Sequence, residues 1–471
     1  MTPTVTRHPP EHGRAAAATM SRMRYHFSGV GGAGMSPLAR LMRARAHPVQ
    51  GSDRAFDAGR NGDAADALRA AGVELVPHDG RGITRGIDRF VFSTAVEAET
   101  PEMRAARGLG LTMIARPALL AELVNTGRPG VAVSGTSGKS TITGMLAWLV
   151  RESGAPAAVI GGAALVGEGG GGCLVTGPEN RAVAAEADES DGTLVGYRPA
   201  LGLIHNVSRD HTELEPLRKQ FATFATQCGR LFVNARCAEA SAIGRDVGAT
   251  SYGVADGADA PVTPRALGPG RATGLLRWHG SDVALDVPQP GLHNLENAAA
   301  AALVALELGI PPGDVERLLA RFPGVARRFE TIGVTRAGIR VIDDFAHNAE
   351  KIRAALTTAQ AAAPRVVAAF QPHGFGPARF LRGELRELLP RLLRRDDRFC
   401  YAEIFYAGGT VTRDLSSRDL AADIGGAYAP DHAALVRWVA GEARPGDMVL
   451  LMGARDPELP RLARQVFAAL A

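Results

Sequence analysis

The feature that most constrains this chain is a glycine-flanked loop between a short apolar run and a helical pattern. Residues 135–141 read GTSGKST; the strand-like run Val131–Val133 precedes them and helical spacing covers Ser140–Arg151. Glycines at such a junction let backbone N–H groups surround an anion at the start of the helix. Because helices follow strands here and in later segments, the chain is predicted to be α/β with a parallel sheet.

The loop itself predicts a site for ATP and Mg²⁺. Lysine is rare in this chain, with three lysines among its 53 basic residues, and one of them follows the second loop glycine. Its ammonium suits the terminal phosphates, and a serine or threonine hydroxyl suits Mg²⁺. The standard loop has a further glycine where Val133 stands, so this is a compact variant. The predicted ATP-binding loop residues are Gly135, Thr136, Ser137, Gly138, Lys139, Ser140 and Thr141.

Length and composition predict several globular domains. The 471 residues suggest about three domains, and 46% hydrophobic with 22% charged residues supports several cores. We expect a disordered tail at 1–22 and domains at 23–125, 126–325 and 326–471. Predicted strands are 25–28, 75–77, 89–93, 131–133, 182–185, 203–206, 340–342, 366–370 and 448–452, and predicted helices include 36–45, 140–151 and 294–308.

Charge, cysteine usage and hydropathy exclude several classes of protein. A net charge of +4 without a basic stripe, together with 5% aromatic residues, argues against nucleic-acid binding. No apolar run is long enough to span a membrane. Four scattered cysteines form no disulfide framework, which favours a reducing, cytoplasmic setting.

A second glycine-rich turn, Gly29–Gly34, separates a predicted strand from a predicted helix near the N-terminus. Such a turn lets backbone N–H groups approach a diphosphate. Asp53 follows at a spacing that suits a ribose or base hydroxyl. Taken alone, the turn fits a dinucleotide such as NAD, another nucleotide, or a plain strand-to-helix connection.

Polar residues follow two later strands of the central stretch. The run Glu186–Asp191 (EADESD) places four carboxylates after a buried strand, which suits a hard cation or a solvated acidic turn. Asn206 and Asp210-His211 follow the next strand, and His211 is a candidate second metal ligand. Carboxyl ends of parallel strands share one edge of a sheet, so these residues are expected near the GTSGKST loop.

Three further motifs are individually ambiguous. GLHNLEN at 291–297 opens a helix, where Asn297 suits an adenine edge and Asn294 suits a helix cap. Arg327-Arg328 offers cationic charge for a phosphate. DDFAH at 343–347 follows a strand and suits ribose, phosphate or substrate.

In this order the motifs resemble the Mur ligases, ATP-dependent amide-forming enzymes of peptidoglycan synthesis. The resemblance runs from about Tyr25 to the C-terminus. Within the family HFSGVGGAGMS, EADESD and FQPH at 370–373 look most like the branch that joins UDP-N-acetylmuramate to an amino acid, L-alanine. It implies a Rossmann-like first domain for the UDP-sugar, a central phosphate-loop ATPase domain, and a Rossmann-like third domain that brings the amino acid and closes over ATP.

The resemblance also implies roles for individual residues. UDP-sugar binding falls to Gly29, Gly31, Gly32, Gly34, Met35, Ser52 and Asp53. Beyond the loop, ATP binding falls to His293, Asn294, Asn297, Arg328 and Asp344. Metal binding falls to Ser140, Glu186 and His211, and catalysis to Lys139, Glu186, His211, Arg328 and His347.

The chain departs from the family pattern near the expected amino-acid site. After FQPH it continues Gly374–Arg379 (GFGPAR) where Arg-Tyr-Thr-Arg is usual, and Asn348-Ala349 replaces His-Pro. The alternatives are a paralogue that joins another amino acid or a murein peptide, a non-catalytic nucleotide-sugar binder, a folylpolyglutamate-type ligase, and an NAD-dependent dehydrogenase. We expect a monomer or homodimer with no nucleic-acid or membrane partner.

Overall fold

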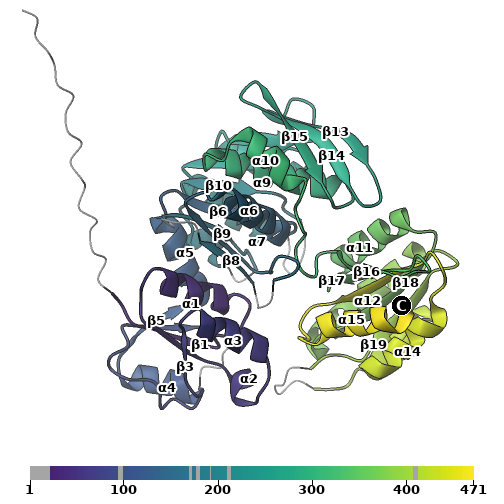
Figure 1. Cartoon of the computed structure of the whole chain (residues 1–471), viewed down its shortest axis with the longest axis horizontal. Coiled ribbons are helices and arrows are strands. Elements are labelled where there is room, and N and C mark those ends of the chain that lie inside the picture. The colour runs from purple at the N-terminus through teal and green to yellow at the C-terminus, as the bar shows by residue number, and fades with distance from the viewer. Residues whose placement is uncertain are drawn as a thin grey trace, which may run out of the picture.

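The protein folds into three α/β units, each built on its own sheet (Figure 1). The computed structural model describes residues 22–93, 99–168, 172–176, 181–190, 192–208, 214–406 and 412–471. The tail predicted at 1–22 therefore lies almost wholly outside the described residues, as does His211. Within the described residues, the three-unit α/β class predicted from the sequence is confirmed.

The first unit is a five-stranded parallel sheet in the order β3-β2-β1-β4-β5. Its central strand β1 is fully buried. The strand order reverses at β1, which is the position where open α/β sheets bind ligands beyond the carboxyl ends of their strands. The predicted strand 25–28 is confirmed. The elements are β1 (Tyr25–Ser28), α1 (Met35–Ala44), β2 (Val49–Ser52), α2 (Arg54–Asp57), α3 (Gly62–Ala70), β3 (Glu74–Leu75), β4 (Arg89–Phe92), α4 (Pro101–Gly108), β5 (Thr112–Ala115) and α5 (Arg116–Thr126).

The second unit carries a ten-stranded sheet in the order β15-β14-β13-β12-β11-β10-β6-β9-β7-β8. Strands β13–β15 pair antiparallel with one another, and β8 pairs antiparallel with β7. The strands are β6 (Gly130–Ser134), β7 (Ala157–Gly161), β8 (Cys173–Thr176), β9 (Ala182–Glu186), β10 (Leu201–Ile204), β11 (Arg230–Asn234), β12 (Thr250–Gly253), β13 (Ala260–Leu267), β14 (Ala272–Trp278) and β15 (Ser281–Val287).

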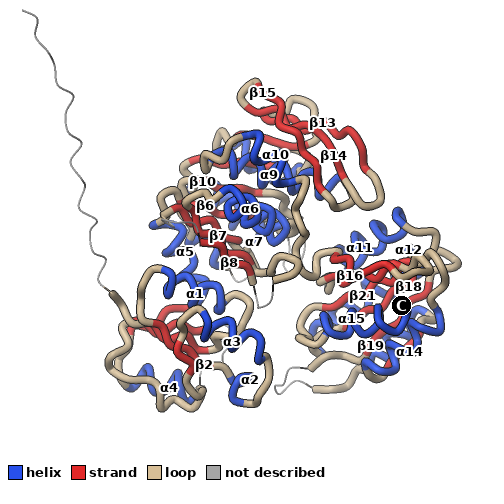
Figure 2. Tube along the Cα trace, in the orientation of Figure 1, coloured by secondary structure: helices blue, strands red, loops and turns tan. Residues whose placement is uncertain are grey.

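Helices cover this sheet, and a loop after α10 leads to the third unit, as Figure 2 shows. The apolar helices α6 and α9 pack against each other in the largest core cluster. The predicted parallel sheet is present, and β13–β15, which pair antiparallel with one another, add an extension that was not predicted. The helices are α6 (Lys139–Ser153), η1 (Thr193–Gly196), α7 (Leu214–Gln227), α8 (Ala238–Asp246), α9 (Leu292–Glu307) and α10 (Pro312–Leu319).

The third unit is a six-stranded sheet in the order β16-β17-β21-β18-β19-β20, parallel except for β16. Its buried central strands explain the apolar runs found in the sequence. The elements are β16 (Glu330–Val334), β17 (Arg340–Asp344), α11 (Ala349–Ala362), β18 (Val366–Gln371), α12 (Phe375–Leu392), β19 (Arg398–Ala402), α13 (Ser417–Ile424), β20 (Ala427–Ala429), α14 (His432–Glu442), β21 (Met448–Gly453) and α15 (Leu459–Leu470).

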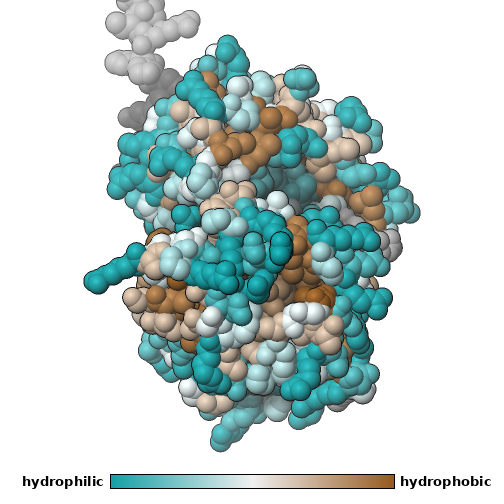
Figure 3. Space-filling model, turned by 90° about the vertical axis from the view of Figure 1, so that its right-hand side faces the viewer, coloured by the Kyte–Doolittle hydropathy of each residue, from teal (hydrophilic) through white to brown (hydrophobic). Residues whose placement is uncertain are grey.

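The face of the molecule drawn in Figure 3 is largely hydrophilic, with small apolar patches between polar side chains. Large apolar side chains are seldom exposed, and the most exposed of those described is Phe380 at 64%. In the described part of the chain, no helix combines the length and apolar character needed to cross a membrane.

Candidate functional site

The GTSGKST loop lies between the buried strand β6 and the helix α6, as predicted. Gly135 and Gly138 both have positive φ, at 141° and 82°, a backbone region that favours glycine. A Cβ built on Gly138 would lie 2.7 Å from Oδ1 of Asn297, so the loop also needs glycine there for space. The glycine pattern therefore reflects both backbone conformation and close packing.

Neighbouring strands supply the groups that hold this loop. Asn206, just beyond β10, accepts hydrogen bonds from the Ser137 N–H at 2.8 Å and the Thr136 hydroxyl at 2.9 Å. Its own amide donates to the Ser137 hydroxyl at 2.9 Å. Asn206 therefore shapes the loop by holding the side chains and the N–H groups of Thr136 and Ser137. The N–H groups at the start of α6 are the natural phosphate ligands.

Lys139 is held by carboxylates of the EADESD run. Its Nζ lies 2.6 Å from Glu189 Oε2, 3.5 Å from Asp188 Oδ1 and 2.6 Å from the Gly135 carbonyl. Burial alone lowers the pKa of Lys139, but the neighbouring carboxylates outweigh burial and raise it. Lys139 is thus a buried, permanently charged cation beside the loop, which is the property that a phosphate-binding lysine requires.

Two of the three predicted metal ligands lie together. The Ser140 hydroxyl donates to Glu186 Oε1 at 3.0 Å, and Glu186 Oε2 accepts the Gly162 N–H at 3.1 Å. A hydroxyl and a carboxylate are hard oxygen donors of the kind that Mg²⁺ prefers, so this pair fits the ion. The third predicted ligand, His211, lies outside the described residues, and among those described no cluster of three metal-binding side chains occurs.

The start of α9 faces the loop. Asn297 Nδ2 donates to Asn294 Oδ1 at 3.3 Å, while Asn297 Oδ1 is buried beside Gly138 with no hydrogen-bond partner. Asn294 does not cap the helix, because Gly291 occupies the N-cap and Asn294 donates to the Pro290 carbonyl at 2.8 Å. His293 is exposed at the same helix end. An unsatisfied buried amide oxygen is suited to a donor such as an adenine amino group.

The segment that opens the third unit reaches across to the phosphate loop. Arg328 Nη2 donates to the Ser140 hydroxyl at 3.1 Å. Arg327 and Phe329, on either side of it, have positive φ values of 59° and 51°. Positive φ at residues other than glycine stores strain and concentrates at functional sites. This backbone conformation turns Arg328 out of the third unit toward the loop.

Asp344 and His347 lie at the carboxyl end of β17, where the sequence predicted a site. Asp344 accepts the N–H groups of Phe329 and Ala346, each at 2.7 Å, and burial raises its pKa. His347 Nδ1 lies 2.9 Å from the Phe345 carbonyl oxygen, and its ring lies 5.6 Å from that of His373. Asp344 therefore braces the turn that carries Arg328, while the ring of His347 lies beside that of His373, which follows β18.

In the first unit, the glycine-rich turn is closed by Asp53. Its Oδ2 accepts the Gly31 N–H at 3.0 Å, and its Oδ1 caps α2 through the Ala55 N–H at 2.8 Å. A Cβ on Gly31 would approach Asp53 and Phe56 within 3 Å. Gly29 has φ 81° and Gly32 is exposed on the turn. Asp53 thus has a structural role, because it links the turn to the end of β2.

Ser52 and Met35, two further predicted UDP-sugar residues, have buried side chains. The Ser52 hydroxyl lies 3.0 Å from His78 Nδ1, which also lies 3.0 Å from the buried carboxylate of Glu102. Met35 packs into the core beneath α1. These two side chains support the turn from below.

Comparison with known proteins covers the same three units. The Mur ligase family catalytic domain matches residues 24–128, the Mur ligase middle domain 133–305 and the Mur ligase glutamate ligase domain 327–455. The chain belongs to the Mur ligase family. This membership accounts for the motifs after residue 135, which a dehydrogenase would leave unexplained.

Curated Mur ligases resemble the chain along nearly its full length. It is 37% identical to a UDP-N-acetylmuramate–L-alanine ligase from Kineococcus radiotolerans, covering 94% of this chain and 96% of the relative. Identity is 33% to the enzyme of the same name from Solidesulfovibrio magneticus, covering 92% and 95%.

Solved structures share the fold. The UDP-N-acetylmuramate–alanine ligase of Thermotoga maritima superposes with a TM-score of 0.76 at 24% identity, covering 95% of this chain and 99% of that one. The murein peptide ligase of Psychrobacter arcticus gives 0.66 at 21%, covering 95% and 98%. Because both identities are low, the two matches bear on the fold alone.

The structure brings Asn297 and Arg328 to the phosphate loop, while Asp344 braces the turn that carries Arg328. It also adds residues that the sequence did not single out. Glu189 pairs with Lys139. His205 is buried against Gly138, and burial together with nearby His293 lowers its pKa to about 4. Glu189 had a weak signal, as one of four acids in a run. His205 had none, because a single histidine after an apolar strand has no distinctive pattern.

Proposed function

We propose that this Mur ligase joins the carboxylate of UDP-N-acetylmuramate to L-alanine at the expense of ATP. The observation that carries the proposal is the meeting of Lys139, Ser140, Glu186 and Arg328 around one loop. Two cations, a hydroxyl and a carboxylate from separate segments meet where the helix α6 begins. This arrangement suits transfer of a phosphoryl group, in which catalysis rests on positioning and charge.

The first chemical step follows from those charges. The sugar carboxylate attacks the γ-phosphorus of ATP, forming an acyl phosphate as the bond to ADP breaks. Negative charge gathers on the phosphoryl oxygens, so Lys139 and Arg328 stabilise it best when fixed in place beforehand. Backbone N–H groups at the start of α6 would orient the phosphates.

The second step forms the amide. The amine of the amino acid attacks the acyl carbon, a tetrahedral intermediate forms, and inorganic phosphate leaves while the amine loses its proton. The third unit places His347 and His373 at the carboxyl ends of β17 and β18. We propose that the amino acid enters from this side and that Arg328 moves with the third unit as it closes on ATP.

We propose ATP and Mg²⁺ as the cofactors. Ser140 and Glu186 would hold the ion, with His211 as the further ligand that the family resemblance implies. Bound there, Mg²⁺ would supply positive charge to the phosphate oxygens. Asn297 would meet the adenine, Asp344 the ribose, and Asp53 with the glycine turn the UDP portion of the sugar nucleotide.

We further propose domains at 23–125, 126–325 and 326–471, in a monomer or homodimer without nucleic-acid or membrane partners. A cytoplasmic location agrees with the three described cysteines Cys228, Cys237 and Cys400, which are all free. Each proposed domain contains one of the three sheets.

The decisive test measures phosphate released from ATP and Mg²⁺ in the presence of UDP-N-acetylmuramate. The acceptors are L-alanine, glycine, L-serine, other amino acids and the murein tripeptide L-alanyl-γ-D-glutamyl-diaminopimelate, with mass spectrometry of the product. We expect release with L-alanine and a ligated product. Release with the tripeptide alone would transfer the assignment to a murein peptide ligase, and binding of the UDP-sugar without any release would favour a non-catalytic binder.

A further inference from the structure

His205 stands where three segments of the proposed ATP site meet. It directly follows β10, the strand that lies between β6 and β11 in the second sheet. Its backbone N–H donates to the carbonyl of Ser134, at the end of β6, at 2.9 Å. A Cβ built on Gly138 would lie 3.3 Å from His205 Nε2 and 2.7 Å from Asn297 Oδ1. The imidazole and the amide oxygen therefore approach the same glycine of the phosphate loop.

The position of the imidazole hydrogen depends on Tyr252, in β12. Among the described residues, the His205 ring makes one hydrogen bond, between Nδ1 and the Tyr252 hydroxyl at 2.7 Å. Burial lowers the pKa of His205 to about 4, so the ring is neutral near pH 7 and has a single N–H. Burial also raises the pKa of Tyr252 well above its usual 10, so the hydroxyl keeps its hydrogen.

Of the two ways to arrange these hydrogens, one leaves a buried donor unpaired. If Nδ1 donated to the hydroxyl oxygen, the phenolic hydrogen would have no acceptor among the described residues, and Tyr252 is fully buried. An unpaired donor in a protein core is costly. The hydroxyl therefore donates to Nδ1, and Nε2 carries the imidazole hydrogen. His205 thus presents an N–H donor beside Gly138.

Asn297 presents the complementary group. Its Oδ1 is buried and has no hydrogen-bond partner in the part of the chain that the structure describes, while its Nδ2 donates to Asn294 Oδ1 at 3.3 Å. An acceptor next to a donor matches the edge of adenine that carries the N6 amino group and the ring nitrogen N7. Guanine has an oxygen in place of that amino group, which Asn297 Oδ1 would repel.

We propose that His205 recognises the base of ATP by donating its Nε2 hydrogen to N7 of adenine, while Asn297 Oδ1 accepts the N6 amino group. The proposal deepens the proposed function and rests on it, because it adds a residue that determines nucleotide specificity. Tyr252 is a positioning residue, since it fixes the histidine tautomer from the core of the second unit.

The test compares the binding of ADP and 7-deaza-ADP, each with Mg²⁺, to the full chain by calorimetry. The two nucleotides differ only in that a C–H group replaces N7, and ADP avoids turnover. We expect the wild type to bind 7-deaza-ADP about 10-fold more weakly than ADP, because a buried N–H loses its acceptor. This comparison uses the unaltered protein, so its result does not depend on whether a variant folds.

Variants then show whether His205 is the source of the preference. His205→Phe should bind ADP about 10-fold more weakly than the wild type does and should bind both nucleotides alike. His205→Gln keeps an N–H near the position of Nε2 and should retain part of the preference, whereas Tyr252→Phe should reduce it. The matched control is His279→Asn, at an exposed histidine between β14 and β15, which should behave as the wild type.

The outcomes separate this proposal from the proposed function. Equal affinity of the wild type for ADP and 7-deaza-ADP would overturn the role of His205. A His205→Phe variant that weakened both nucleotides by the same factor would overturn it too, because loss of structural support alone has that effect. If the wild type bound neither nucleotide, both proposals would fall. If binding depended on N7 but no acceptor led to phosphate release, the ligase proposal alone would fail.

Discussion

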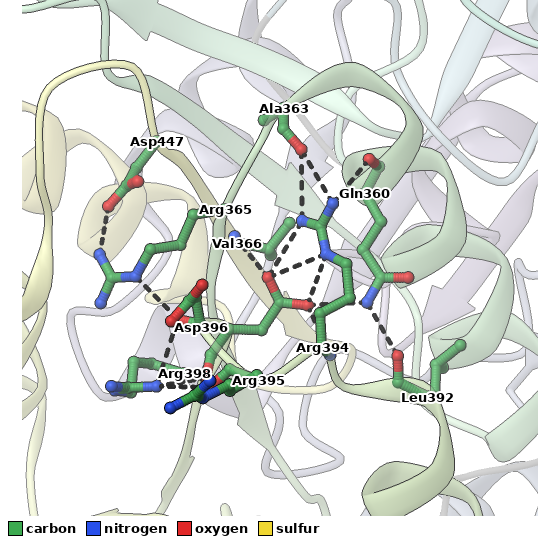
Figure 4. A network of polar contacts seen from close by, with 11 residues as sticks. Gln360, Ala363, Arg365, Val366, Leu392, Arg394, Arg395, Asp396, Arg398 and Asp447 are labelled. Carbon is green, nitrogen blue, oxygen red and sulfur yellow. Dashed lines mark hydrogen bonds and ion pairs between the residues drawn. The ribbon is translucent and has the colours of Figure 1, made fainter.

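Two polar clusters of the molecule use similar residues in opposite ways. We call Lys139, Ser140, Glu186, Glu189 and Arg328 the phosphate-site cluster. The sheet-base cluster lies at the amino ends of β18, β19 and β21 and contains Arg365, Arg394, Asp397 and Asp447 (Figure 4). Both combine cations with carboxylates, yet only the first is proposed to act on a substrate.

In the sheet-base cluster, the arginines are fully occupied by acceptors of their own unit. Arg365 donates to Asp447 at 2.5 Å and to the carbonyls of Asp396 and Glu442 at 2.8 and 2.9 Å. Asp397 accepts from the Arg394 guanidinium and from the Val366 N–H at 2.9 Å. Such a network joins three strands to the loops before them and leaves no group available for a ligand.

The phosphate-site cluster is instead assembled from separate segments and strained backbone. Arg328 comes from another unit and stands between two residues with positive φ. Asn297 Oδ1, beside the loop, has no partner. The comparison teaches that residue type alone does not mark a site. What marks it is where the donors point, and whether the contacts they make can be exchanged for those of a substrate.

The largest expected effect is on Lys139. Lys139→Ala should reduce phosphate release at least 1,000-fold, about 4 kcal/mol, because the transferred phosphoryl group loses a fixed positive charge. Steady-state phosphate release measures this, and UDP-sugar binding by calorimetry should remain nearly intact. Lys219→Ala is the matched control, since its side chain is 77% exposed. Surviving activity in Lys139→Ala would refute the assignment of the phosphate loop.

The sheet-base cluster should respond in stability and not in turnover. Arg365 is 7% exposed and pairs with the buried Asp447, so Arg365→Ala leaves a buried carboxylate unpaired and should cost about 3–4 kcal/mol of unfolding free energy. Urea unfolding measures the cost, and kcat of the folded protein should change less than twofold. Arg382→Ala, at an ion pair on the surface of the same unit, serves as the control. A large loss of kcat without a loss of stability would contradict the comparison.

The free energy of unfolding should depend on pH because of His205, which lies beside the phosphate site. Burial lowers the pKa of His205 to about 4, below the 6.5 of an unfolded chain, so the unfolded state binds the proton more readily. Stability should be fully present above pH 6.5 and fall as the pH drops toward 4, by at most about 3 kcal/mol. Unfolding curves across this range test the expectation. His205→Gln should flatten that part of the profile, and an identical slope in the variant would exclude His205 as its source.

The smallest expected effect is on Asp53, in the first unit. Asp53→Ala removes the bonds to the Gly31 and Ala55 N–H groups and should weaken UDP-sugar binding by about 1–3 kcal/mol. Calorimetric affinity of UDP-N-acetylmuramate measures the loss. Asp66→Ala, an exposed carboxylate of the same unit, is the control. An affinity equal to the wild type would remove Asp53 from the binding site.

Local patterns were sufficient to predict much of the architecture. The strand 25–28 and the helix after GTSGKST occur where apolar runs and glycines predicted them. Strands β13–β15 were missed, because their alternating, half-exposed residues resemble ordinary polar segments. Backbone conformation and burial are encoded over a few neighbouring residues, which is why such patterns are readable.

Contacts between residues that follow different strands of a sheet could not be predicted from local sequence patterns. Strand β6 lies between β10 and β9 although neither is its neighbour along the chain, and this order places Asn206 and Glu186 on the two sides of the phosphate loop. The same holds for Arg116, which reaches Gly34 only because β5 and β1 belong to one sheet.

The sequence by itself determined the α/β class and the two glycine-rich turns, and it predicted the roles that we propose for Lys139 and Glu186. Those properties depend on short stretches whose hydrogen bonding and chemistry are local. Only the tertiary structure decided that Glu189 holds Lys139, that His205 supports Gly138 and that Arg116 lies against Gly34. These contacts join residues far apart in the chain, and their energies depend on burial and charge that exist only once the sheets have formed.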